Sequence, residues 1–362
     1  MTGGGTAGHI LAALEVLLAY RKEFACEGFF IGSDMGFEAR LAPGSGERVE
    51  LIPARPWARQ SWRGQLRAIT ATLRAMAAAR RILRREKTEL VIGMGGYASV
   101  APCLAARTLG LRVVIHEANA VPGLANRVLV HVADLVCVDS EQTARGFRST
   151  RVVVTGTPSL LPAPVPPTSQ PPYRFIVLGG SEGSPWLNNH VPELFAAVRR
   201  RSVDFTVHHL TGMESPEPTQ ALYDALGVPA QVEGWVSDMN RVYAGTTLAI
   251  ASPGARTLAE LSNAGIASLL TPLPGIAHGH HDANGLLISE RAGARFVGEA
   301  EWNNEELAGW IASLLSQPDT LRAMGEKMRL HAHPGAAEAI VREAEKLFDA
   351  PSLVSVQPAP RL

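Results

Sequence analysis

The chain has 362 residues, 46% of them hydrophobic, and its 34 lysines and arginines balance its 34 aspartates and glutamates. That length exceeds one ordinary core, so we expect two domains, and the lack of net charge argues against nucleic acid as a partner. Three cysteines without a Cys-x-x-Cys pair favour a reducing cytoplasm. The sequence shows no signal-peptide pattern and no uninterrupted apolar run long enough to span a bilayer.

The first notable element is a glycine-rich loop, residues 2–9, which leads directly into an apolar helical pattern. Glycines let backbone N–H groups approach a ligand, and a helix N-terminus favours an anion. The loop matches the dinucleotide fingerprint, and a nicotinamide site would need an acidic residue roughly 20 residues later, at the end of the second strand. Asp34 is a candidate for this acid, but nothing else in the sequence supports such a site. The other interpretation is a diphosphate cradle with His9 at its edge.

Short apolar runs alternate with helical patterns through the first half, which indicates buried parallel strands. The runs are residues 29–32, 90–93, 112–115, 135–138 and 152–154. Such alternation predicts an α/β fold with a doubly wound parallel sheet, whose ligands lie beyond the carboxyl ends of the strands. A glycine-rich loop normally follows a strand, yet only Met1 and Thr2 precede Gly3. We therefore expect the natural start of translation to lie upstream.

An arginine-rich segment, residues 55–85, contains no acidic residue. Its arginines are Arg55, Arg59, Arg63, Arg67, Arg74, Arg80, Arg81, Arg84 and Arg85. A helix is expected from about Gln65 to Arg85, with an apolar stripe made of Leu66, Ile69, Leu73 and Met76. Two compatible interpretations remain open. The stripe packs into the core, or the segment, with Trp57 and Trp62, contacts anionic lipid headgroups.

Two polar loops follow strands of the first half, residues 93–99 and 116–126. Histidine, glutamate and asparagine are unusual neighbours for an apolar sheet, so a functional edge is indicated. For Glu117 the alternative is a turn whose shape it holds by hydrogen bonds.

The second half begins after a proline-rich segment that cannot continue a helix or a central strand. We expect a first domain of residues 1–162, a linker of 163–172, a second domain of 173–347 and a disordered tail of 348–362. A second glycine-rich loop, residues 179–184, follows an apolar strand pattern.

Two further patterns in the second half bear on ligands. Residues 253–260 predict a loop entering a helix, where Glu260 either accepts hydrogen bonds from ribose hydroxyls or is a solvated helix acid. Residues 278–284 hold three histidines and an aspartate, but their spacing fits no standard zinc pattern and the chain has no Asp-x-Asp. No metal and no cofactor are therefore expected.

In this order the motifs resemble those of the MurG family of glycosyltransferases (family 28), up to about residue 347. They are GGGTAGH, GMGGYASVAP, IHEANAVPGLANR, GGSEGS, GWVSDM and PGARTLAELSNAGIASLLTPLP followed by HHDAN. The resemblance implies the GT-B architecture, with two Rossmann-like domains facing a cleft. It also implies transfer of N-acetylglucosamine from UDP-GlcNAc to lipid I, giving lipid II, by one direct inverting displacement. The enzyme would be peripheral on the cytoplasmic face of the inner membrane, held by its anionic surface and associated with cell-wall synthesis proteins.

The same resemblance implies a role for each matching residue, beginning with His9 as the general base and Glu117 beside it in the catalytic group. The implied acceptor-binding residues are Thr6, Gly8, Gly95, Gly96, Tyr97, His116, Asn119 and Asn126. The implied donor-binding residues are Gly180, Ser181, Val236, Gly254, Thr257, Glu260, His280, His281 and Asn284. Among these, Gly180 and Ser181 would meet the phosphates, Val236 the uracil and Glu260 the ribose.

Several donor-side residues depart from the family pattern. Gly-Asn-Pro-Val-Arg is replaced by residues 156–160, Gly-Thr-Pro-Ser-Leu, and Ser252 stands in place of an arginine. Glu182 and His281 replace glutamines, and Arg256 is a candidate substitute for one lost arginine. Two alternatives to a lipid II synthase follow: a diverged GT-B transferase with another donor or acceptor, or a catalytically degenerate paralogue that acts as a binding or scaffold protein.

Overall fold

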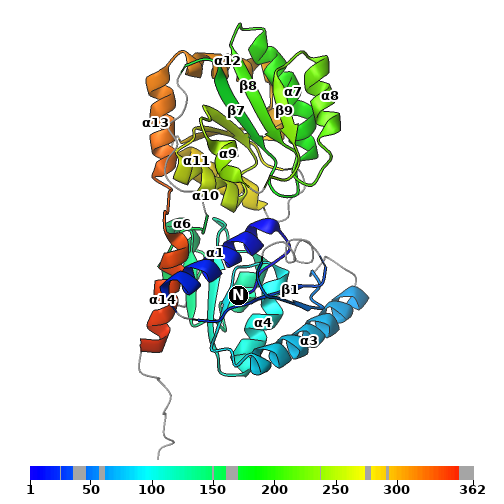
Figure 1. Cartoon of the computed structure of the whole chain (residues 1–362), viewed down its shortest axis with the longest axis vertical. Helices are drawn as coiled ribbons and strands as arrows, with labels where there is room; N and C mark the ends of the chain where they lie inside the picture. The colour runs from blue at the N-terminus through cyan, green and yellow to red at the C-terminus, as the bar shows by residue number, and fades with distance from the viewer. Residues whose placement is uncertain are drawn as a thin grey trace, which may run out of the picture.

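The computed structural model describes most of the chain as two α/β halves, one above the other in Figure 1. The described residues are 1–24, 26–35, 46–56, 62–148, 151–159, 170–236, 238–273, 279–290 and 293–349, without the side chains of 62–69. The predictions for Trp57, Arg59, His278, most of the linker and the tail from Ala350 fall outside these residues.

All paired strands of the first half are parallel. They are β1 (Phe30–Ser33), β2 (Val49–Ile52), β3 (Leu90–Gly93), β4 (Arg112–Glu117), β5 (Leu135–Val138) and β6 (Val152–Val154). Strands β3 to β6 pair in chain order, and β1 pairs with β2. Thr2 forms single parallel bridges to Ile31 and Gly93, so the residues before the first loop lie between the two strand groups.

The second half has one parallel sheet in the order β9-β8-β7-β10-β11-β12. Its strands are β7 (Tyr173–Leu178), β8 (Phe205–Leu210), β9 (Ala230–Glu233), β10 (Leu248–Ala251), β11 (Ser268–Leu270) and β12 (Ala294–Phe296). In chain order within this half the sequence of strands is 3-2-1-4-5-6, the doubly wound arrangement of dinucleotide-binding sheets. The predicted α/β class with two doubly wound sheets is confirmed.

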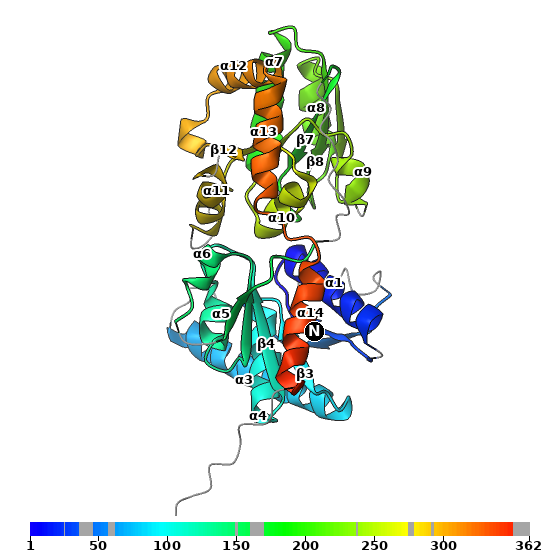
Figure 2. The same ribbon diagram turned by 90° about the vertical axis from the view of Figure 1, so that its left-hand side faces the viewer.

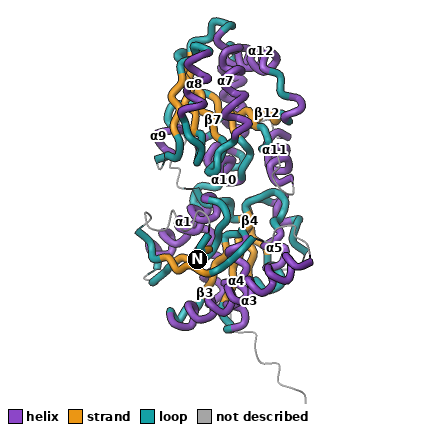
Figure 3. Tube along the Cα trace, turned by 90° about the vertical axis from the view of Figure 1, so that its right-hand side faces the viewer, coloured by secondary structure: helices purple, strands orange, loops and turns teal. Residues whose placement is uncertain are grey.

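Helices cover both sheets, as the purple segments around the orange strands show in Figure 3. Those of the first half are α1 (Ala7–Glu23), α3 (Trp62–Arg85), α4 (Tyr97–Thr108), α5 (Leu124–Leu129) and α6 (Glu141–Ala144). Those that follow are α7 (Pro185–Arg199), α8 (Glu217–Ala225), α9 (Met239–Tyr243), α10 (Ala255–Ala264), α11 (His280–Glu290), α12 (Asn304–Leu315), α13 (Pro318–Arg329) and α14 (Ala336–Asp349), with a 3-10 turn at Glu299–Glu301.

The interpretation of the α3 stripe as core is wrong for Leu73. Leu73 is 58% exposed, whereas the fully buried residues of the described face are Ala75, Ala79, Ile82 and Leu83. Helix α3 packs against α4, and Leu73 lies on its solvent side beside Arg74. Met76 packs against the core, as the stripe predicted.

Helix α14 returns to the first half, although its sequence follows the second. It packs against α1 (Figure 2), and Ile340, Val341 and Ala344 are buried in one cluster with Ile10 and Val16. The predicted second domain extends to residue 347, but in the structure its last helix packs with the first half. Helical periodicity predicts which face of a helix is buried, but it does not predict which other element packs against that face.

The chain therefore passes between the halves twice, after β6 and between α13 and α14. One side chain at the end of α10 contacts both passages: Asn263 Nδ2 donates to Ser159 Oγ (2.8 Å), and its Oδ1 accepts from the His333 amide (3.1 Å). Gly156 lies directly against His333, since a Cβ at this glycine would be 2.0 Å from the histidine Cβ.

Ile340→Ala is expected to lower the free energy of unfolding by about 2–5 kcal/mol, because it leaves a cavity in the core of the first half. Urea unfolding followed by circular dichroism measures the change. Leu330→Ala, at a side chain that is 69% exposed, is the matched control and should change stability little. Equal effects of the two substitutions would contradict the packing of α14.

Candidate active site

The strand order places one ligand edge in each half, at the point where the direction of winding changes. In the first half this point lies between Thr2 and β3, where residues 3–8 and 94–97 follow. In the second half it lies between β7 and β10, where residues 179–184 and 252–254 follow. Each edge therefore joins two loops that the sequence analysis singled out.

Glycine is required where the two loops of the first half meet. Gly5, Gly95 and Gly96 have φ angles of 90°, 93° and 75°, which L side chains rarely adopt. A Cβ at Gly96 would lie 1.8 Å from the Gly4 carbonyl oxygen. The loops consequently contact through their backbones, and this contact fixes the start of α1.

His9 stands in the first turn of α1, with its ring directed at these loops. Its Nδ1 lies 3.1 Å from the Gly4 carbonyl oxygen and 3.1 Å from Thr6 Oγ1. A carbonyl oxygen only accepts, so the neutral ring carries its proton on Nδ1 and keeps a lone pair on Nε2. On the other side a Cβ at Gly95 would come within 3.3 Å of Nε2, so glycine keeps space beside this nitrogen.

Burial lowers the pKa of His9 below the ordinary 6.5, and His280 from the second half lowers it further. Glu117 and the bond to Gly4 oppose this shift without cancelling it. His9 is thus a neutral imidazole near pH 7 with an available lone pair, which is the state that a general base needs.

Glu117, at the end of β4, holds the loop that follows it. Its Oε1 accepts from the amide and the side chain of Asn119 (3.0 and 2.9 Å), and its Oε2 accepts from the Gly123 amide (2.8 Å) and Asn126 Nδ2 (2.9 Å). The side chain is almost fully buried. These bonds correspond to the alternative given for Glu117 in the sequence analysis, in which it holds the shape of a turn. They place Glu117 behind the surface of the loop.

The remaining acceptor-side residues divide into buried and accessible groups. His116 Nε2 donates to the Gly156 carbonyl (2.9 Å), and burial lowers its pKa to about 4, so it is neutral and structurally engaged. Asn126 donates to the His116 carbonyl (2.8 Å), and its amide oxygen has no hydrogen-bond partner among the described residues. Tyr97, which donates to the Met35 carbonyl (3.2 Å), and Thr6 line the more open side.

The glycine-rich loop of the second half, residues 179–184, repeats the backbone contact of the first half. Gly180 and Gly183 have φ angles of 84° and 87°, and a Cβ at Gly183 would lie 2.1 Å from the Thr211 carbonyl oxygen. Ser184 caps α7 by accepting from the Leu187 amide (3.1 Å). Gly180 and Ser181 therefore precede a helix N-terminus, a position that favours phosphate.

Helix α10 presents a different arrangement from the one expected. Arg256 Nε donates to Glu260 Oε1 (2.8 Å), and its Nη2 donates to Glu15 Oε1 of α1 (2.7 Å). Two carboxylates therefore engage Nε and Nη2 of Arg256, the candidate substitute for a lost arginine, and its Nη1 has no hydrogen-bond partner among the described residues. Thr257 lies beside the capping residue Gly254, 3.8 Å from the position of a Cβ there.

Helix α11 contributes residues from the other side of the donor loops. His281 Nδ1 accepts from the Leu273 amide (3.3 Å), which leaves Nε2–H as a donor near Gly254, and burial lowers the pKa of this histidine to about 4. Asn284 Oδ1 accepts from the Ala120 amide (2.8 Å) and its Nδ2 donates to Asn119 Oδ1 (3.2 Å). Val236 packs against the buried cluster that includes Val242 and Tyr243 of α9.

The structure therefore brings His9, His280, His281 and Asn284 to one interface between the halves. Sequence reasoning missed Glu15 and Tyr243 there. Glu15 left a signal, since it is an acid inside the apolar run of residues 10–19 and is almost fully buried. Tyr243, whose hydroxyl donates to Glu260 Oε2 (2.9 Å), gave none.

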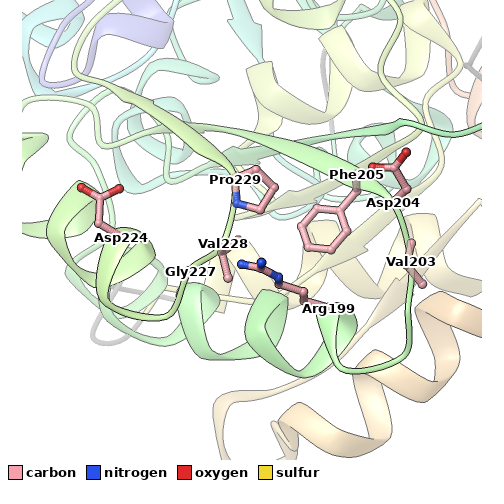
Figure 4. Close-up of a pocket in the computed structure, with 8 residues that line it drawn as sticks. All are labelled: Arg199, Val203, Asp204, Phe205, Asp224, Gly227, Val228 and Pro229. Atoms are coloured by element: carbon pink, nitrogen blue, oxygen red, sulfur yellow. The ribbon is translucent and has the colours of Figure 1, made fainter.

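A shallow depression of about 460 Å³ lies elsewhere in the second half (Figure 4). It is lined by Arg199 at the end of α7, by Asp224 of α8, and by residues at the starts of β8 and β9, Phe205 and Pro229 among them. Ligands of doubly wound sheets bind at the opposite, carboxyl ends of the strands, so this depression is not the active site. Among the described residues no group of three or more potential metal ligands is found, and no described helix is long and apolar enough to cross a membrane.

Glu117→Gln is expected to lower the free energy of unfolding by about 1–3 kcal/mol, because one oxygen acceptor of the loop is replaced by a donor. Amide exchange at Asn119 and Gly123 should accelerate in the same variant. Glu326→Gln, at an exposed acid of α13, is the control. Unchanged exchange at both amides would show that Glu117 does not hold this loop.

Comparisons with known proteins agree with this geometry. Residues 1–138 match the glycosyltransferase family 28 N-terminal domain, and residues 175–340 match the family 28 C-terminal domain. Two curated relatives carry the name UDP-N-acetylglucosamine–N-acetylmuramyl-(pentapeptide) pyrophosphoryl-undecaprenol N-acetylglucosamine transferase. The one from Geotalea uraniireducens is 32% identical over 95% of this chain and 96% of its own, and the one from Stutzerimonas stutzeri is 34% identical over 93% and 95%.

Among solved structures, the crystal structure of Acinetobacter baumannii MurG superimposes with a TM-score of 0.75. The superposition covers 96% of this chain and 98% of the A. baumannii chain, and the two sequences are 28% identical. Three findings lead to one conclusion: two family models match in the expected order, relatives match along nearly the whole length, and a solved structure has the same fold. The chain belongs to glycosyltransferase family 28 and has the two-domain GT-B fold of MurG.

Proposed function

We propose that this chain transfers N-acetylglucosamine from UDP-GlcNAc to lipid I, forming lipid II, by a single inverting displacement. The observation that carries the proposal is the arrangement of His9. Its Nε2 lone pair lies at the acceptor edge of one half, and the phosphate-type loop at Gly180 forms the facing edge of the other. The named activity of the two curated relatives supplies the substrates.

In the proposed reaction the acceptor's sugar hydroxyl attacks the anomeric carbon of the donor. A new carbon–oxygen bond forms there as the bond to the UDP phosphate breaks. His9 Nε2 takes the hydroxyl proton, and the electron pair of the broken bond leaves with UDP. Attack from the face opposite UDP inverts the anomeric centre, so no sugar becomes attached to the enzyme.

The protein stabilises the departing diphosphate through α7 and the loop before it. Positive φ angles at Gly180 and Gly183 turn backbone groups toward the edge, and the N-terminus of α7 carries partial positive charge. This field is fixed before reaction, so little reorganisation accompanies the loss of UDP.

Donor specificity is assigned to α10 and α11. Glu260 accepts from the ribose hydroxyls, and His281 Nε2–H donates to the sugar or its phosphate. Asn284 stands at the same place, although here its amide bonds to the acceptor loop. Val236 is assigned to the uracil.

Two observations favour testing a second function, that of a catalytically degenerate paralogue. Ser252 replaces an arginine, and Arg256 is engaged by carboxylates. A degenerate paralogue would bind UDP weakly, whereas the proposed enzyme should be stabilised thermally by UDP. An enzyme that uses another acceptor would bind UDP normally but would form no product with lipid I.

His9→Ala is expected to reduce kcat by about 10²–10⁴-fold, because the general base is lost. Transfer of labelled N-acetylglucosamine to a short-chain lipid I analogue measures the rate. UDP affinity should remain near that of the wild type, since His9 lies on the acceptor side. His190→Ala, at an exposed histidine of α7, is the control.

The pH profile separates a base from a structural histidine. Because the pKa of His9 is lowered from 6.5, kcat/KM should be constant above that pH and fall tenfold per unit only at lower pH. An acidic limb centred above 6.5, or near-normal turnover of His9→Ala, would contradict this role.

Membrane attachment is proposed for the exposed face of α3. Leu73, Arg74, Arg81, Arg84 and Arg85 are exposed on this helix, which contains no acidic residue, although Arg85 pairs with Glu50 and Glu86. An exposed leucine among arginines suits the boundary between lipid headgroups and acyl chains. We assign a peripheral position on the cytoplasmic leaflet, where lipid I is made accessible to the cleft.

The double substitution Arg74→Glu and Arg81→Glu should weaken binding to phosphatidylglycerol vesicles at least about 30-fold, at roughly 1 kcal/mol per lost basic residue. Vesicle co-sedimentation measures this, and transfer to a water-soluble acceptor should be unaffected. Arg200→Glu with Arg322→Glu, in the second half, is the charge-matched control. Equal retention of both double variants would rule out this face.

A further inference from the structure

An ion bridge joins the two halves beside the donor edge. Arg256 contacts Glu260 on its own helix and Glu15 on α1, at 2.8 and 2.7 Å. The Glu15 and Glu260 side chains are 3% and 9% exposed, and that of Arg256 is 19% exposed. Buried charges of this kind persist only when their partners are well placed, so the bridge constrains all three side chains.

Glu260 is held from two directions. Arg256 Nε donates to Oε1, and the Tyr243 hydroxyl donates to Oε2 at 2.9 Å. A carboxylate has about four acceptor sites, so two remain for a ligand's hydroxyl groups. The guanidinium and the phenol therefore fix the rotamer of Glu260 and leave it able to accept a pair of hydrogen bonds.

The other end of the bridge reaches the helix that carries His9. Glu15 lies six residues after His9 on α1, about 9 Å along the axis at 1.5 Å per residue. The starts of α1 and α10 also abut, since a Cβ at Gly8 would lie 3.7 Å from the Arg256 Cβ. One guanidinium thus links the carboxylate of the nucleoside site to the helix of the base.

We propose that Arg256 is a positioning residue of the donor site. It orients Glu260 toward the nucleoside hydroxyls and, through Glu15, sets the position of the nucleoside relative to His9. This assignment rests on the proposed function, in that it takes a uridine nucleotide as the donor. Arg256 itself does not contact the reacting atoms.

The test compares the affinities of UDP and 2′-deoxy-UDP by calorimetry, without acceptor. The wild type should prefer UDP by about tenfold, the value of one hydrogen bond of ordinary strength. Arg256→Met should bring the preference close to one, as Glu260→Gln should, and Arg256→Lys should restore part of it. Arg322→Met, which removes an exposed arginine of α13, should leave the preference unchanged.

Glu15→Gln tests the other end of the bridge and keeps the side-chain shape. It should retain the wild-type preference for UDP, because the contact of Arg256 with Glu260 remains, while kcat falls about tenfold through misalignment of the halves. Circular dichroism and thermal unfolding of each variant establish that it is folded. If Arg256→Met does not fold, the preference of Arg256→Lys for UDP over 2′-deoxy-UDP decides. A preference below that of the wild type supports the proposal, and an unchanged preference contradicts it.

A folded Arg256→Met protein with the wild-type preference for UDP would overturn the proposal. A wild type that binds no UDP would overturn both this proposal and the proposed donor. A wild type that binds UDP but transfers no sugar to lipid I would overturn the proposed reaction alone, since the preference ratio still decides the role of Arg256.

Discussion

The structure depends on close backbone contact between paired loops at the winding point of each sheet. In the first half Gly96 touches the Gly4 carbonyl, and in the second Gly183 touches the Thr211 carbonyl, at separations that exclude a Cβ. These contacts set where α1 and α7 begin, and hence where their N-terminal backbone groups point. His9 gains its position from the same contact, because Gly4 also accepts its Nδ1 proton. The shape of the loops, the direction of the two helix N-termini and the orientation of His9 thus have one origin.

The interface between the halves uses the same polar groups as the proposed chemistry. Asn284 bonds to the acceptor loop, and Glu260 is linked through Arg256 to α1. Substrates must therefore replace or add to contacts that the protein already makes with itself. A group that is satisfied within the protein before binding loses less rotamer entropy when a ligand arrives. Arg256 with Glu15 belongs to this internal pairing, so a substitution at either residue would change the contact between the halves.

Sequence patterns predicted the features that depend on local order. The apolar runs at 90–93 and 135–138 coincide with β3 and β5, and the run at 29–32 is one residue from β1. The site loops were found because glycine, histidine and asparagine are conspicuous after apolar strands. The partner of α14, the solvent position of Leu73 and the engagement of Arg256 were not found. Each of these depends on contacts between distant segments, such as Glu15 with Arg256, whose distance in the chain gives no local signal.

The contacts of Asn263 have a mechanical consequence. Because Asn263 bonds to Ser159 in one passage and to His333 in the other, a rotation of the halves that preserves both bonds must turn about the end of α10. Arg256 lies seven residues away on the same helix, a lever arm of roughly 10 Å at 1.5 Å per residue. A swing of roughly 10° would move it by roughly 2 Å, more than a hydrogen bond to Glu15 tolerates. A rotation of that size would therefore separate Arg256 from Glu15 while both passages stay bonded to Asn263.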